Sequence, residues 1–244
     1  MRRYMSHYNE NLLCAIDVET TGLDPRIHEI VQVAILPLDI FFNPLQDVLP
    51  FNILIKPIRV NCIDHKAMKV NKLSLRRLCR DGMSYEMSHD LFDRWMKQLD
   101  LRPHADGQPR QIMPLGHNYQ FDKSFLIQWL GLETYNTNFH WHIRDTMASA
   151  LFLKDRFSLF MHKDPLPKVN LSYLCACLKI KRVRSHDALC DCVDTAKVYQ
   201  KMTKMFAPNQ TFSDPRVTEI LEILDSGNID AAEFLKELKA QPKT

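Results

Sequence analysis

The feature that most constrains the fold of this chain is a short apolar run that leads directly into two acidic residues. Residues 12–16 read LLCAI and are followed by Asp17, Val18 and Glu19. Side chains of a strand alternate between its two faces, so residues two apart point the same way. We therefore predict a buried strand over residues 12–18 with both carboxylates on one face near its end. Two such anions repel each other, and the arrangement requires cations or a shared proton.

The composition is that of an ordinary globular protein. Of the 244 residues, 45% are hydrophobic and 25% are charged, which fits one large domain or a domain with an appendage. The net charge is only +3, so any binding to nucleic acid has to depend on local basic patches. Residues 1–10 lack the apolar core of a signal peptide, and no apolar run approaches the ~20 residues that span a bilayer.

The cysteines indicate a reducing compartment. There are seven of them, scattered and mostly within apolar stretches, which favours free thiols in a cytoplasmic protein. The pairs Cys175/Cys177 and Cys190/Cys192 are each separated by a single residue. Zinc ligands are usually separated by two to four residues, so we expect no zinc site at these pairs.

The order of elements predicts an α/β layered domain over residues 1–207. After the first strand, the sequence indicates two more strands joined as a meander and a short later strand. These strands are expected at 29–38, 51–56 and 112–116, with a strand-like or irregular stretch at 139–145. Helices are expected at 71–80, 84–99, 121–130, near 146–154, 170–178 and 187–204.

The chain after Pro208 reads as a small helical extension over residues 208–244. Two short amphipathic segments there are joined at Gly227. We expect this extension to pack on the main domain, or to dock a polymerase or another protein partner.

A third acidic residue falls on an apolar helix face. In the predicted helix 121–130, Asp122 lies within the stripe formed by Phe121, Phe125 and Leu126. A charged carboxylate on a buried face is costly unless something pairs with it. Asp122 is therefore a helix cap, a member of a buried ion pair, or a metal ligand.

Residues 184–200 add a cluster of acids and a histidine. Asp187, Asp191 and Asp194 lie opposite the apolar stripe of the predicted helix. Helical geometry alone favours solvent-facing acids at Asp187 and Asp194. His186 stands at the helix start beside Ser185, which is a candidate N-cap.

Three motifs together resemble those of a known enzyme family. They are D-x-E-T-T-G at 17–22, H-N-x-x-F-D at 117–122 and H-D-A-x-x-D at 186–191. In order and spacing they are similar to the DEDDh 3′–5′ exonucleases, which include DnaQ-like proofreading subunits of DNA replication and repair, the RNase T group and oligoribonucleases. The resemblance covers about residues 11–204 and implies an RNase H-like fold with a mixed five-stranded sheet flanked by helices. Position 187, where the tyrosine subtype has Tyr, holds Asp here.

The resemblance implies a two-metal mechanism that explains the paired acids. Two divalent cations, Mg²⁺ or Mn²⁺, prefer oxygen ligands and clamp the attacking and leaving oxygens of a phosphodiester. Asp17 would bridge both ions, Glu19 and Asp122 would hold one, and Asp191 the other. His186 would act as the general base, since an imidazole titrates near neutral pH.

Further residues of the motifs are implied in binding the 3′ end of a single-stranded nucleic acid. The backbone near Thr20 and Thr21 would meet the terminal hydroxyl, and Leu23 would wedge against the terminal bases. Gly22 permits a sharp turn and close approach. Asn118 is either a substrate contact or a turn residue.

The basic segment KIKRVRS at 179–185 precedes His186 directly and is either solvated surface or a phosphate contact. The sequence as a whole predicts an exonuclease that releases nucleoside 5′-monophosphates, with DNA favoured. The alternatives are an RNA-directed enzyme, for which no residue that reads the 2′-hydroxyl can be named, and a non-catalytic module associated with a polymerase.

Overall fold

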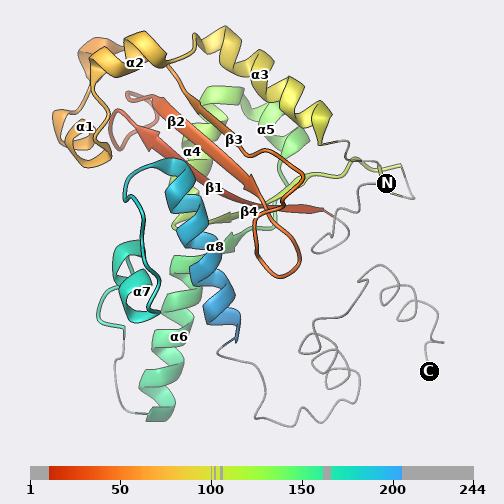
Figure 1. The fold of residues 1–244 in the computed structure, drawn as a ribbon, viewed down its shortest axis with the longest axis vertical. Coiled ribbons are helices and arrows are strands. Elements are labelled where there is room, and N and C mark those ends of the chain that lie inside the picture. Colours follow the sequence, from red (N-terminus) through yellow and green to blue (C-terminus); the bar gives the residue numbers. More distant parts are fainter. Residues whose placement is uncertain (1–10, 100, 102, 105–106, 162–165, 205–244) are drawn as a thin grey trace.

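The computed structural model describes residues 11–99, 101, 103–104, 107–161 and 166–204. These residues form an α/β fold around a five-stranded sheet in the order β3-β2-β1-β4-β5 (Figure 1). The strands are β1 Leu12–Thr20, β2 Ile30–Pro37, β3 Phe51–Leu54, β4 Ile112–Gly116 and β5 Arg144–Asp145. The pairs β1–β2 and β2–β3 are antiparallel, and β1–β4 and β4–β5 are parallel. The sheet is therefore mixed, with the acid-bearing strand β1 at its centre.

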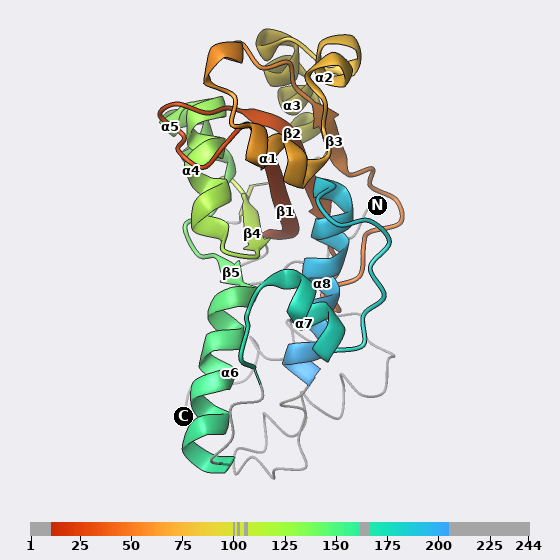
Figure 2. The ribbon, with the colours of Figure 1, turned by 90° about the vertical axis from the view of Figure 1, so that its left-hand side faces the viewer.

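Helices cover both faces of the sheet. They are the 3-10 helix η1 Val60–Cys62 and α1 His65–Asn71, α2 Leu75–Asp81, α3 Tyr85–Gln98, α4 Tyr119–Leu130, α5 Leu132–Asn138, α6 Thr146–Met161, α7 Leu171–Cys177 and α8 Ala188–Lys204. Figure 2 shows β1 between α4 on one side and α8 on the other. In the described residues, no helix is long and apolar enough to cross a membrane.

The alternation of β1 side chains divides the interior into two cores. The even-numbered residues from Leu12 to Val18 join a cluster that includes Phe92 of α3 and Trp129 of α4. Leu13 and Ala15 point the other way and pack with Ala188, Cys192 and Ala196 of α8. A third cluster joins α6, α7 and α8. Asp17 and Glu19 thus continue the face of β1 that α8 covers.

The structure confirms the predicted fold class but corrects several boundaries. The first strand runs to Thr20, so the two acids lie within it. The helix expected at 71–80 begins only at Leu75, because Lys72 has a left-handed conformation (φ 59°) and Ser74 caps α2 by accepting from the Arg77 N–H. Helices α1 and α5 were not predicted, and α6 continues past 154 to Met161. The extension predicted at 208–244 lies outside the described residues.

Trp129 tests the larger core. Its side chain is 1% exposed, its indole N–H donates to Ser88 Oγ at 2.9 Å, and its ring lies against Phe51 and Phe92. Trp129→Ala should lower the free energy of unfolding by about 3–5 kcal/mol, because it leaves a cavity and removes a buried hydrogen bond to Ser88.

Denaturant unfolding measures this loss, and Trp141→Ala is the matched control. Trp141 is 75% exposed, so its removal should change the free energy of unfolding by less than about 0.5 kcal/mol. Equal losses in the two variants would contradict this account of the core.

Candidate active site

The first part of the site is the polar end of β1. Glu19 is 9% exposed, and Asp17 is partly buried. Asp17 lies opposite Ala34 and Glu19 opposite Gln32 in the ladder with β2, and the register shifts directly after Glu19. Sheet pairing therefore fixes the backbone of both acids, and the irregularity after Glu19 ends their shared face.

Asp122 belongs to α4, which packs on the face of the sheet opposite to α8. It lies in the first turn of α4 and is 3% exposed. Its Oδ1 accepts a hydrogen bond of 3.0 Å from the N–H of Val18, the residue between Asp17 and Glu19. Asn118, not Asp122, is the N-cap of α4, and Asp122 forms no ion pair with any residue in the described part of the chain. Neither structural alternative therefore accounts for this buried carboxylate.

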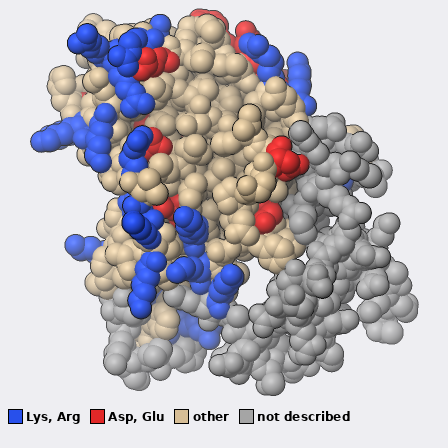
Figure 3. Space-filling view, viewed as in Figure 1, with Lys and Arg blue, Asp and Glu red and all other residues tan. Residues whose placement is uncertain are grey.

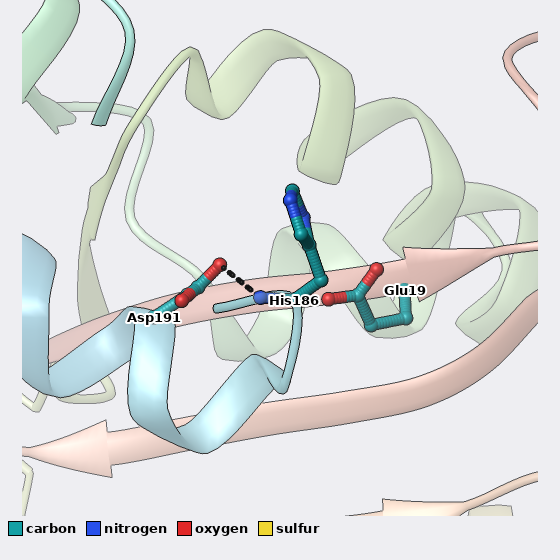
Figure 4. Close-up of side chains that lie close together, drawn as sticks. All are labelled: Glu19, His186 and Asp191. Atoms are coloured by element: carbon teal, nitrogen blue, oxygen red, sulfur yellow. Dashed lines mark hydrogen bonds between the residues drawn. The ribbon is translucent and has the colours of Figure 1, made fainter. Parts of the chain in front are cut away.

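Asp191 and His186 complete a cluster with Glu19. Asp191 lies in the first turn of α8, is 7% exposed, and accepts at Oδ2 from the His186 N–H at 3.2 Å. A carboxylate oxygen of Glu19, one of Asp191 and a ring nitrogen of His186 all lie within 4.8 Å of one another (Figure 4). His186 has a left-handed backbone (φ 59°). Residues from β1 and from the start of α8 thus meet at one point.

The start of α8 corrects two expectations. The helix begins at Ala188, so Ser185 is too far upstream to cap it; Asp187 Oδ1 instead accepts from the Cys190 N–H at 3.3 Å. Asp194 is not a solvent-facing acid, because it is 3% exposed and pairs with Arg182 Nε at 2.7 Å. The helical wheel missed this burial because the segment that precedes α8 folds back over its acidic face.

Burial and mutual repulsion raise the pKa values of the clustered acids. Burial raises the pKa of Asp17 well above its usual value, and the charges of Asp122 and Glu19 raise it further. Burial, followed by repulsion from Asp191, raises the pKa of Glu19 to about 8. Burial also raises the pKa of Asp122, although the Val18 N–H opposes this shift. The pocket therefore holds negative charge at a high cost unless cations are present.

The donor set fits divalent cations. Carboxylate oxygens from three separate segments are the ligands that Mg²⁺ and Mn²⁺ prefer. The ligand atoms of Glu19, His186 and Asp191 lie close enough together to hold such an ion, and Asp17 and Asp122 are the further acids that would complete the predicted ligand set. Bound cations would relieve the electrostatic repulsion among these buried carboxylates.

The two threonines of the first motif are buried and fixed by hydrogen bonds. Thr20 and Thr21 are 6% and 1% exposed. The Thr21 N–H donates to the Glu29 carbonyl at 2.9 Å, and Thr21 Oγ1 accepts from the Glu29 N–H at 2.9 Å. Asn71 Nδ2 of α1 donates to the Thr20 carbonyl at 3.1 Å. The previously unassigned helix α1 therefore supports this turn.

The remaining motif residues lie at the turns beside the site. A Cβ added to Gly22 would meet the ring of His28 at 2.1 Å, so any larger residue there would displace His28. Leu23 is 77% exposed. Asn118 is exposed with a left-handed backbone (φ 66°), and its N–H donates to Asp145 at 3.2 Å. Leu23, directly after the first motif, is thus an apolar side chain that is open to a ligand, and Asn118 has turn geometry.

Comparison with known proteins identifies the family of this chain. Residues 14–199 match the family model RNase_T, described as an exonuclease. The chain belongs to this exonuclease family. The match covers all three motifs and confirms the resemblance drawn from them. No curated protein matches the chain in sequence.

Solved structures share the fold of this family member. Cell-death related nuclease 4 has a TM-score of 0.61 at 17% identity, over 80% of this chain and 64% of that one. Exonuclease I of Methylocaldum szegediense has a TM-score of 0.59 at 22% identity, over 80% of this chain and 40% of that one. The zinc-bound complex of E. coli Exonuclease I with single-stranded DNA has a TM-score of 0.60 at 18% identity, over 80% of this chain and 41% of that one. The chain therefore spans less than two thirds of the length of each.

The shifted pKa of Glu19 gives a prediction for the metal-free protein. A carboxyl whose pKa rises from 4.5 to about 8 on folding binds protons more readily in the folded state, so stability falls as pH rises between these values. In chelator, the melting temperature should therefore be lower at about pH 8 than at about pH 5.5.

Mg²⁺ should restore the melting temperature most at the higher pH, because it binds ionised carboxylates. Glu19→Gln is the control, and it should show a smaller dependence on both pH and Mg²⁺. A wild-type melting temperature that Mg²⁺ leaves unchanged at about pH 8 would argue against a metal site here.

Proposed function

We propose that this protein is a metal-dependent 3′–5′ exonuclease of single-stranded nucleic acid, with DNA favoured. It would hydrolyse the terminal phosphodiester bond and release nucleoside 5′-monophosphates. The observation that carries the proposal is the cluster of Glu19, Asp191 and His186 within 4.8 Å, with Asp122 tied to the same strand. A non-catalytic binding module would gain nothing from buried acids that repel both one another and a phosphate backbone.

Each side chain has a role in this reaction. Asp17, Glu19, Asp122 and Asp191 would hold two divalent cations, which stabilise charge on the attacking and leaving oxygens. His186 would accept a proton from the attacking water, and its partly exposed position beside Glu19 suits that task. Its N–H contact with Asp191 ties the base to the carboxylate cluster.

Positive surfaces on two sides of the cluster support a nucleic-acid substrate. Figure 3 shows Lys and Arg gathered over the α1–α2 segment and over α7–α8. Six exposed cations form what we term the basic rim: Lys66, Lys69, Lys72, Arg76, Lys179 and Lys181. Lys72 Nζ reaches the Ser185 carbonyl at 3.5 Å, so the two sides meet next to His186. Such cations attract a phosphate backbone despite the low net charge.

The preference for DNA rests on analogy with E. coli Exonuclease I, whose solved complex contains single-stranded DNA. A role in DNA replication or repair would follow from such a preference. Matched DNA and RNA strands labelled at the 5′ end, with Mg²⁺, Mn²⁺ or chelator, test it in one gel. Faster shortening of RNA would replace the DNA assignment with the RNA-directed alternative.

Two substitutions test the assigned roles. Asp17→Asn should abolish hydrolysis, because it removes a carboxylate that would hold the divalent cations. His186→Ala should reduce the single-turnover rate by about 10²–10⁴-fold, the usual contribution of general base catalysis. Wild-type rates in both variants would remove these roles, and thermal melting serves as the control for folding.

The basic rim predicts a specific salt dependence. Lys69→Gln combined with Lys181→Gln should weaken binding of single-stranded DNA and reduce the slope of log K against log salt by ~0.7 per lost phosphate contact. The matched control is Arg94→Gln with Lys97→Gln on exposed positions of α3. If both double variants change the slope equally, the effect is one of net charge and not of the rim.

A further inference from the structure

Arg182 contacts three side chains next to the carboxylate cluster. Its Nε lies 2.7 Å from Asp194 Oδ2, its Nη2 contacts Asp191 Oδ1, and its Nη1 contacts Ser172 Oγ of α7. The side chain is only 15% exposed. The basic segment 179–185 was expected to be either solvated surface or a phosphate contact, but Arg182 turns inward. All three nitrogens of the guanidinium are therefore committed to side chains of α7 and α8.

One of these three side chains is a proposed metal ligand. Asp191 uses both oxygens within the protein, Oδ1 for Arg182 and Oδ2 for the His186 N–H. Both contacts come from the short segment between α7 and α8. The orientation of Asp191 toward Glu19 is therefore set by this segment as well as by α8 itself.

Arg182 also supplies positive charge where the cluster needs it. Its guanidinium opposes the rise in the pKa of Asp191 and, more weakly, that of Asp17. An ordinary buried ion pair contributes little net stability, so stability alone is a poor account of an arginine placed here. Each carboxylate oxygen has two lone pairs, so Asp191 can accept from Arg182 and still coordinate a cation.

We propose that Arg182 is a positioning residue that holds Asp191 in a metal-binding orientation, with Asp194 and Ser172 as its anchors. The proposal rests on the proposed function in taking Asp191 as a metal ligand. The planar fork of arginine is required, because one flexible ammonium group cannot contact three acceptors in fixed directions. Residues that orient ligands in this way usually change metal affinity by about 10–100-fold when substituted.

Calorimetric titration of the metal-free protein with Mn²⁺, without substrate, tests the proposal. Arg182→Gln should weaken Mn²⁺ binding by about 10-fold or more, and Asp194→Asn should weaken it in the same direction. Arg182→Lys keeps the charge and should not restore wild-type affinity. The control Lys197→Gln removes one positive charge from the exposed side of α8 and should change affinity by less than about 2-fold.

For Arg182→Gln, electrostatics alone predict the opposite result, since the loss of a cation beside Asp191 and Asp17 should favour metal binding. Unchanged or tighter Mn²⁺ binding by folded Arg182→Gln or Asp194→Asn would overturn the proposal. If Arg182→Gln does not fold, Ser172→Ala decides, because it removes one anchor of the Arg182 guanidinium without changing any charge; unchanged Mn²⁺ affinity in this variant would then overturn the proposal. If the wild-type protein binds Mn²⁺ but shows no nuclease activity, and Arg182→Gln binds Mn²⁺ more weakly than wild type, this inference stands while the proposed function fails.

Discussion

Buried negative charge on one face of β1 is the constraint on which the rest of this structure depends. Asp17 and Glu19 continue the face that Leu13 and Ala15 use to pack against α8, so the strand that builds the core also carries the acids into the interior. The Val18 N–H offsets part of the cost by donating to Asp122, and the His186 N–H and Arg182 do the same for Asp191. Divalent cations would neutralise the negative charge that these contacts leave uncompensated.

The architecture makes this convergence possible. Asp122 lies in the first turn of α4 on one side of the sheet, and Asp191 lies in the first turn of α8 on the other. The first turn of a helix favours a carboxylate through its free N–H groups and its dipole, so both acids occupy positions where the backbone stabilises them. Helix α1 braces the turn after β1 through Asn71 and Thr20. The three motifs of the exonuclease family thus become a single site at the sheet centre.

Local patterns predicted the parts of the fold that carry continuous apolar signals. The run before Asp17 gave β1, and the stripe around Asp122 indicated that this acid is buried. Boundaries set by single residues were missed, such as the left-handed Lys72 that separates α1 from α2. The burial of Asp194 was also missed. It depends on Arg182, which lies outside α8, and a helical wheel describes only the residues of one helix. Long-range pairing of charges is a tertiary property that spacing along the chain does not encode.

Anomalous diffraction from crystals soaked in Mn²⁺ tests the central claim most directly. The account predicts two Mn²⁺ peaks ~3.5–4 Å apart, both within coordinating reach of Asp17 and surrounded by Glu19, Asp122 and Asp191. Peaks elsewhere on the protein, with none at this cluster, would contradict it.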